Sequence, residues 1–247
     1  MFGQIRTQAS DDLGRDAFPF LPKLVEHIGH IGHVVKPMPV NGLANPERNR
    51  AMGRCRPVSD SEADSMEAHC QGPEELALIR GFRHTAYRSN ETAALVVSDV
   101  WDGHQVRDRV QIQARHMKKK VSRRPIPMVP ELKKALLCWF MQLRQSGLLK
   151  PDTPVWLSRK CKTVMQGWSR ETLWRKVKSI ADRAGVLGAI GCHSFRKLFC
   201  VRIYDASGRD IMKTASAMGH RQISSTQQYL DSIVLDADMD ELILKAA

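Results

Sequence analysis

The segment MGHRQISSTQQYL runs from Met218 to Leu230 and sets the expected architecture at this end of the chain. It places His220 nine residues before Tyr229, in a short turn that is followed by a helix. A tyrosine near a histidine is a candidate nucleophile beside a candidate hydrogen-bonding partner. A Gly-His pair is nevertheless common by chance, and a surface helix with satisfied polar groups explains this segment equally well when it is taken alone.

Two further motifs precede this segment. HSFRK places His193 and Arg196 at positions i and i+3, hence on one face of a helix. TAYRSNE places Arg88 at the start of a helix, with Glu91 one turn further on. Each of these fragments is weak evidence by itself, because short polar patterns recur in unrelated helices.

In this order, the motifs resemble the tyrosine recombinase family of the phage-integrase type. That signature is an arginine in a T-G-x-R-x-x-E turn, a lysine in a β-hairpin, H-x-x-R, and then G-H followed by tyrosine. The resemblance extends from about Arg54 to the C-terminus and includes the connecting segments RPVSDSEAD and RRPIPMVPELKKAL. It implies an α+β fold, a mostly helical catalytic domain with a small antiparallel sheet, over residues 55–247. Residues 1–54 are then a short helical remnant of a core-binding domain with its linker.

The resemblance implies a site-specific DNA recombinase that cleaves and rejoins DNA through a 3′-phosphotyrosyl intermediate on Tyr229. Arg88 and Arg196 would neutralise the phosphate, because a guanidinium forks onto two oxygens and stays charged. A free phenol ionises only near pH 10, so the nucleophile needs a base, for which His193 is the candidate. His220 would hydrogen-bond the phosphate or position the site. The covalent link conserves bond energy and the arginines replace a metal, so neither a cofactor nor a metal is expected.

The hairpin lysine of the signature has three candidates. Lys118, Lys119 and Lys120 are consecutive, and the register of the hairpin decides which of them points into the site. Alignment on the RRPIP segment allows Lys118 or Lys119, and we choose Lys118 as the general acid.

The sequence departs from the family pattern in two places. Ala86 stands where the family usually has glycine, which suggests an altered turn before Arg88. Only about 54 residues precede the catalytic domain, and of these LVEHIGHIGHVV looks like the last helix of a core-binding domain. Weak clamping of DNA follows as a hypothesis, and normal affinity in a filter-binding assay would count against it.

Hydrophobic periodicity and capping signals predict the remaining elements. Ser59 with Glu62 three residues on predicts a helix start. Val96–Trp101 reads as a short β-branched strand before an Asp102-Gly103 hairpin turn. Further strands are expected over 107–114 and 125–128, and further helices over 21–35, 74–84, 89–95, 130–145, 170–184, 193–207, 211–218, 224–230 and 236–245.

The composition restricts the class of protein. The 247 residues are 43% hydrophobic and carry a net charge of +12, from 38 Lys and Arg against 26 Asp and Glu. This charge favours binding to polyanions, and RHMKKKVSRR over 115–124 has six Lys and Arg and no acid. No apolar run is long enough for a membrane span and no secretory signal is visible, so a cytoplasmic protein is expected. The six cysteines form no CxxC pair and are interpreted as reduced.

Other kinds of site are less well supported. His27, His30 and His33 form HxxHxxH, but this span turns through more than one helical turn and no further ligand completes a zinc site. Cys192 and Cys200 are better explained by packing than by catalysis. The tryptophans are expected in the core rather than as platforms for bases; they are Trp101, Trp139, Trp156, Trp168 and Trp174.

Two other functions stay open at this point. A type IB topoisomerase resembles this site but relaxes DNA rather than exchanging strands, and a decayed recombinase would bind DNA without cleaving it. For a recombinase the expected partner is double-stranded DNA, and the resemblance implies a homo-tetramer on it. An apolar stripe in the acidic tail could dock on a neighbouring protomer or on its own domain, with about even weight; it comprises Val234, Leu235, Met239, Leu242 and Ile243.

Overall fold

The computed structural model describes residues 55–110, 112, 125–158, 166–220 and 222–231. All of them belong to one compact unit, Asn49–Ala247. The predicted domain boundary near Arg54 and the helices predicted over 21–35 and 236–245 lie outside the described residues. They stay predictions.

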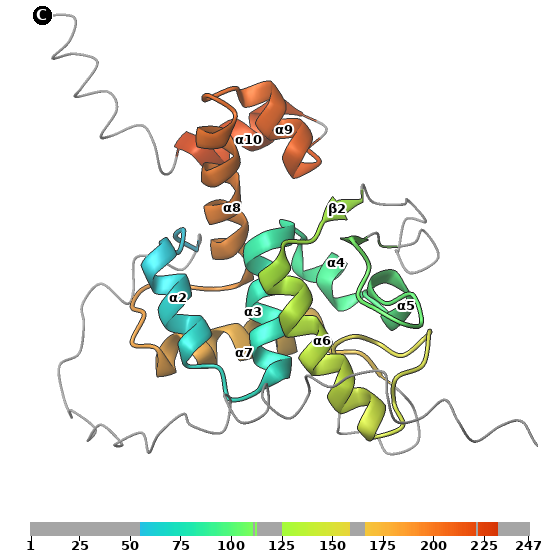
Figure 1. The fold of residues 1–247 in the computed structure, drawn as a ribbon. Coiled ribbons are helices and arrows are strands. Elements are labelled where there is room, and N and C mark those ends of the chain that lie inside the picture. Colours follow the sequence, from blue (N-terminus) through green and yellow to red (C-terminus); the bar gives the residue numbers. More distant parts are fainter. Residues whose placement is uncertain (1–54, 111, 113–124, 159–165, 221, 232–247) are drawn as a thin grey trace, which may run out of the picture. The chain divides into compact units, whose positions relative to one another are not determined.

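The described chain is mostly helical and has one small sheet, as predicted (Figure 1). The sheet pairs β1 (Arg109–Val110) with β2 (Ile126–Pro127) in antiparallel register, Val110 opposite Ile126. The helices are α2 (Asp60–Ala68), α3 (Pro73–Thr85), α4 (Ser89–Ala93), α5 (Val97–Val100), α6 (Pro130–Gln145), α7 (Arg170–Arg183), α8 (Cys192–Ala206), α9 (Ile211–Met218) and α10 (Ile223–Asp231).

Local signals explain where several helices begin. At α2 the Ser59 hydroxyl accepts from the Glu62 amide at 3.2 Å, and the Glu62 carboxylate accepts from the Ser59 amide at 2.9 Å. This is the capping box that the sequence predicts. Pro73 and Pro130 occupy the first turns of α3 and α6, where a missing N–H costs nothing. The predicted start and end of α6 and of α9 are confirmed to the residue.

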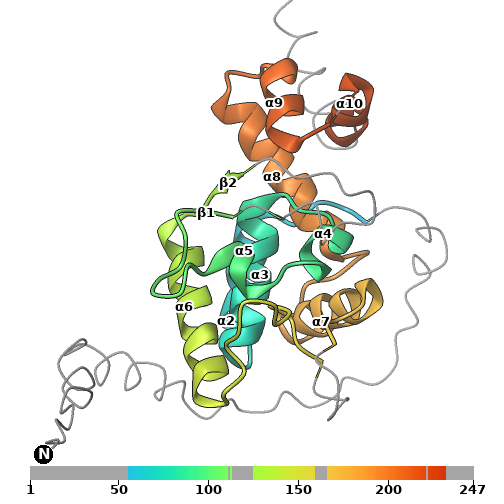
Figure 2. The ribbon, with the colours of Figure 1, turned by 90° about the vertical axis from the view of Figure 1, so that its right-hand side faces the viewer.

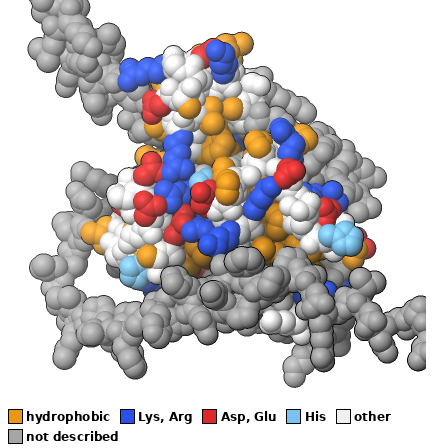
Figure 3. Space-filling model, viewed as in Figure 1, with side chains coloured by type: hydrophobic (Ala, Val, Ile, Leu, Met, Phe, Trp, Pro, Cys, Tyr) orange, Lys and Arg blue, Asp and Glu red, His pale blue; other side chains and the backbone are white. Residues whose placement is uncertain are grey.

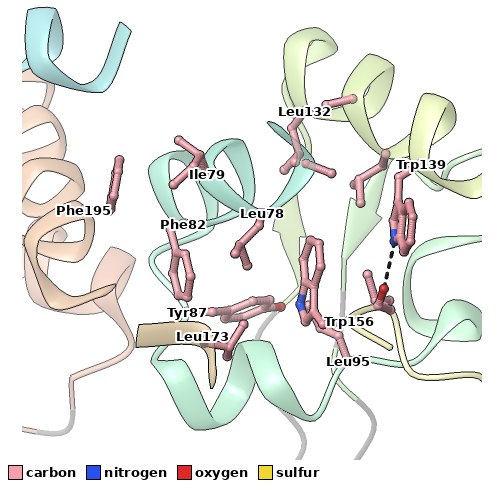
Figure 4. Close-up of a cluster of buried hydrophobic side chains, with 14 of the residues drawn as sticks. Leu78, Ile79, Phe82, Tyr87, Leu95, Leu132, Trp139, Trp156, Leu173 and Phe195 are labelled. Atoms are coloured by element: carbon pink, nitrogen blue, oxygen red, sulfur yellow. Dashed lines mark hydrogen bonds between the residues drawn. The ribbon is translucent and has the colours of Figure 1, made fainter. Parts of the chain in front are cut away.

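The main hydrophobic core lies around α3, which packs against α2, α6 and α8. In Figure 4, Phe82 of α3 faces Phe195 of α8, and their ring centroids are 6.4 Å apart. Trp139 is buried on α6 and donates from Nε1 to the Val155 carbonyl at 2.8 Å. This core therefore fixes α8, which carries part of the candidate site, against the rest of the unit.

A smaller cluster lies among α8, α9 and α10, which gather at one end of α8 (Figures 1 and 2). Cys200, Met218 and Leu230 are buried there together with Ala86, which follows α3. Tyr229 packs against this cluster, so it joins the helix of the candidate nucleophile to the turn before Arg88.

Two expectations about these elements are wrong. Val97–Val100 forms one helical turn rather than a strand, because the Asp99 carboxylate accepts from the Val96 amide at 3.1 Å and so caps it. Trp174 is 48% exposed, because it lies at the edge of the buried face of α7. The other four tryptophans, Cys192 and Cys200 are buried as predicted.

Charged side chains tie α2, α3 and α8 together at the surface. Arg83 is buried on α3 and pairs with Asp64 at 2.6 Å and Glu67 at 2.7 Å, while Arg202 of α8 pairs with Asp60. On the face shown in Figure 3, basic and acidic side chains are interspersed rather than separated into patches. No described helix is both long enough and apolar enough to cross a bilayer.

Removing the cap of α2 should destabilise the protein. In Ser59→Ala the Glu62 amide loses its acceptor, so we expect the free energy of unfolding to fall by about 1 kcal/mol. Urea denaturation followed by circular dichroism measures this. Ser216→Ala, at an exposed position inside α9, is the control and should stay within about 0.5 kcal/mol of wild type. Equal effects of the two changes would contradict the capping role.

Candidate active site

Arg88 stands at the turn between α3 and α4 and is held there by a buried acid. Its amide donates to one Glu91 carboxylate oxygen at 2.9 Å and its guanidinium to the other at 3.2 Å. Glu91 is 3% exposed, whereas the Arg88 side chain is 40% exposed. Next to it, the buried Tyr87 hydroxyl donates to the Val110 carbonyl at 3.1 Å, which links the turn to β1. Glu91 therefore orients Arg88 from the buried side and leaves its side chain open to an incoming anion.

Ala86 ends α3 in the left-handed region, with φ 56° and ψ 14°. A side chain costs about 1–2 kcal/mol in this conformation, which explains why the family usually has glycine there. The methyl group of Ala86 is buried against the smaller cluster, and its packing offsets part of this cost. Ala86 in place of glycine thus affects the energy of the turn, while Arg88 and Glu91 still pair as the motif requires.

Arg196 on α8 is 2% exposed and connects three segments. Its guanidinium donates to the carbonyl of Ala86, to the carbonyl of Met218 at 2.9 Å and to His220 Nε2 at 2.9 Å. Burial and the charge of Arg88 lower the pKa of Arg196, and Tyr229 opposes this shift by its charge and a hydrogen bond. An arginine still remains a cation at working pH.

His220 follows Gly219, which ends α9 with a φ of 64°. While Nε2 receives the bond from Arg196, Nδ1 lies 2.8 Å from the Thr226 hydroxyl. Burial, and then the charges of Arg196 and Arg88, lower the pKa of His220 to about 4. The ring is therefore neutral near pH 7.

Tyr229 is half-buried on α10, and its ring centroid lies 5.5 Å from that of His220. His193 is exposed in the first turn of α8, one turn before Arg196. Desolvation of its ring, and then the charges of Arg196 and Arg88, lower its pKa. It is thus neutral and able to accept a proton.

The structure brings Arg88, Arg196, His220 and Tyr229 together around a small pocket, while His193 lies exposed at the start of α8. Arg88, Glu91, Arg196 and Gly219 line this pocket. His220 and Tyr229 adjoin it through Arg196. Lys118, Lys119 and Lys120 lie outside the described residues, so the choice of Lys118 stays a prediction.

Comparison with known proteins agrees with this geometry. The model of the phage integrase family matches residues 60–234, more than half of the chain. The chain belongs to the phage integrase family. A curated relative, tyrosine recombinase XerC of Herpetosiphon aurantiacus, is 26% identical over 205 residues, which cover 80% of this chain and 62% of the relative. The chain therefore spans less than two thirds of that relative's length.

Solved structures share the fold of this phage integrase family member. The XerA recombinase has a TM-score of 0.60 at 20% identity, covering 82% of this chain and 66% of its own. XerH bound to its palindromic difH substrate in a post-cleavage complex has a TM-score of 0.60 at 16% identity, covering 77% and 53%. At these identities the likeness shows the fold, with one small sheet and mostly helices.

Sequence reasoning missed two residues at this phage integrase site. Thr226 contacts His220, and a hydroxyl three residues before Tyr229 on one helix face was the available signal. Arg170, which opens α7, adds to the positive charge that lowers the pKa of His193. Among the residues that the structure describes, no group of three or more His, Cys, Asp or Glu is arranged to hold a metal ion. The HxxHxxH histidines fall outside that part of the chain.

The two left-handed helix ends at the site should respond differently to substitution. Gly219→Ala should lower the free energy of unfolding by about 1 kcal/mol, because an added Cβ there touches nothing that would offset the strained φ. Ala86→Gly should stay within about 1 kcal/mol of wild type, because relief of strain is balanced by the lost methyl packing and a freer unfolded chain. Urea denaturation of both variants tests this. Strong stabilisation by Ala86→Gly would show that packing of the Ala86 methyl group contributes no stability.

Stability should fall at acidic pH through His220. The unfolded chain binds a proton at the ordinary histidine pKa of about 6.5, but the folded protein does so only near 4. The stability that the neutral ring contributes is thus complete above about pH 6.5 and is lost as the pH falls toward 4, by about 1–3 kcal/mol. Urea denaturation at pH 7.5 and 4.5 should show a smaller loss in His220→Asn than in wild type. His104→Asn, in an exposed turn, is the control, and an unchanged pH dependence in His220→Asn would refute the assignment.

Proposed function

We propose that the chain contains the catalytic domain of a site-specific DNA recombinase that acts in the integration or excision of a mobile element. The reaction cleaves and rejoins double-stranded DNA through a 3′-phosphotyrosyl bond at Tyr229. The observation that carries the proposal is the convergence of Arg88, Arg196, His220 and Tyr229 from four separate segments. Membership of the phage integrase family, and relatives described as tyrosine recombinases, support it.

The two arginines suit a phosphodiester. Arg88 is open to solvent and Arg196 forms the buried floor of the pocket, so an incoming phosphate meets one cation at its rim and one below. The Nε of Arg196 is buried and bonds to no described residue, which leaves one donor unused. Donors fixed in advance stabilise the charge that develops on the phosphate oxygens, without a metal ion.

The bond changes follow from these positions. The Tyr229 oxygen forms a bond to phosphorus while the bond from phosphorus to the 5′-oxygen breaks, and the phenolic proton passes to a base. His193 fits this base because desolvation and the charges of Arg196 and Arg88 lower its pKa, so its neutral ring can accept the proton. The leaving 5′-oxygen takes a proton from an acid, for which the family resemblance offers Lys118. Rejoining reverses these steps with the 5′-hydroxyl of another strand as nucleophile.

The proposal includes the assembly on DNA. A homo-tetramer is the arrangement implied by the resemblance, in which the C-terminal helix predicted over 236–245 docks on a neighbouring protomer or on its own domain. That segment lies outside the described residues. Removal of the chain after Ser232 separates the two cases, because unchanged multimerisation on DNA would defeat docking on a neighbour.

Trapping of covalent complexes tests the chemistry. We expect wild-type protein, mixed with supercoiled plasmid and a diverse DNA pool and quenched with detergent, to leave DNA ends bound to protein. Tyr229→Phe should abolish these adducts. Tyr204→Phe should retain them, because Tyr204 packs against the same small cluster without touching His220, and it is the matched control.

The sequences of the trapped ends separate the candidate functions. Adducts that need Tyr229 and gather at one sequence would establish a recombinase. Adducts spread over all sequences would instead show a type IB topoisomerase. Intact DNA binding without adducts would contradict the proposal and show a non-catalytic DNA-binding protein.

A further inference from the structure

Thr226 is a buried hydroxyl that the proposed chemistry leaves without a role. It lies on α10 three residues before Tyr229 and is 0% exposed. Its Oγ1 is 2.8 Å from Nδ1 of His220. The contact joins the helix of the nucleophile to the histidine that lies against the buried arginine.

The neighbours of His220 determine which nitrogen carries its proton. A guanidinium only donates, so Arg196 requires the lone pair of Nε2. The neutral ring then holds its proton on Nδ1, and the Thr226 hydroxyl accepts it. This assignment follows from the hydrogen-bonding partners of the two ring nitrogens.

A bound phosphate places the opposite requirement on Nε2, which must then donate. Phosphate oxygens only accept, so a neutral His220 bonds to one of them only with its proton on Nε2. Nδ1 then becomes an acceptor and needs a donor. A hydroxyl supplies either role by rotating about its C–O bond, with no movement of heavy atoms. The count of protons on the ring is unchanged, because one leaves Nδ1 for solvent as one arrives at Nε2.

We propose that Thr226 is a positioning residue that holds the His220 ring beside Tyr229 and allows its proton to move from Nδ1 to Nε2 when phosphate binds. The proposal rests on the proposed function, since it takes the phosphodiester as the group that Nε2 meets. Thr226 acts through His220 and does not itself touch the phosphate.

Three variants separate this role from simple packing. Thr226→Val keeps the shape of the side chain and removes the hydroxyl, and Thr226→Ser keeps the hydroxyl. Thr214→Val is the matched control, because Thr214 is also 0% exposed and donates to the Asp210 carbonyl at 2.7 Å within α9. A general cost of losing a buried hydroxyl would appear in both valine variants.

The first readout is the proton of His220 in protein without DNA. Two-bond ¹H–¹⁵N spectra of histidine-labelled protein distinguish the two neutral forms, and His220→Asn assigns the signal. We expect the Nδ1–H form in wild type and in all three variants, because Arg196 holds the lone pair of Nε2 in each. The Nδ1 signal should be shifted in Thr226→Val alone, because only there has the Nδ1 proton lost its acceptor. A wild-type spectrum in Thr226→Val would overturn the proposal.

The second readout is the rate of Tyr229 adduct formation at saturating DNA, on the sequence that the pool selects. We expect Thr226→Val to be about 10- to 100-fold slower with unchanged DNA affinity, Thr226→Ser to stay within about threefold of wild type, and Thr214→Val to match wild type. Equal rates in Thr226→Val and wild type would overturn the proposal. If wild type itself forms no adducts, the proposed function fails, and the spectra still decide whether Thr226 accepts the Nδ1 proton of His220.

Discussion

The arrangement of the site depends on one buried cation. Arg196 gives up most of its contact with water, and burying an unpaired charge is costly. Its guanidinium recovers stability from the carbonyls of Ala86 and Met218, which lie at the ends of α3 and α9 where helix dipoles place partial negative charge. The same bonds hold the two helix ends beside His220. Arg196 thus both stabilises the fold and forms part of the candidate site, so its removal would disturb both.

Positive charge concentrated at this point is one reason why the pKa values of the two site histidines are lowered. Burial and the charge of Arg88 lower the pKa of Arg196, and desolvation together with the charges of both arginines keeps His220 and His193 neutral. Glu91 is the acid that balances part of this charge, and it is tied to Arg88 from the buried side. Two arginines and one carboxylate line the pocket, which therefore favours an anion.

Much of this could be predicted from the sequence because the signals are local. The capping box at Ser59, both ends of α6 and the pairing of Arg88 with Glu91 depend on residues within four positions of each other. The family motif supplied the order of the site residues, but not their contacts. The turn over Val97–Val100 escaped prediction because its β-branched residues favour a strand, a preference that the Asp99 cap overrides. The exposure of Trp174 escaped because it depends on what the rest of the fold places against α7. Thr226 escaped because its partner His220 lies before α10, where the periodicity of that helix does not place it.

The site residues lie mainly where helices end. Arg88, His193 and His220 flank helix termini, where the left-handed residues Ala86 and Gly219 turn the chain toward a common point. Tyr229 differs, because it lies within α10, where its ring packs against the small apolar cluster and against His220 and its side chain hydrogen-bonds to Arg196. Arg88 and Arg196 are thus anchored to the large core through α3 and α8, while Tyr229 is held on α10 against the smaller cluster. Arg196 links the two clusters, because its guanidinium bonds to the end of α3 at Ala86 and to His220, which lies against Tyr229.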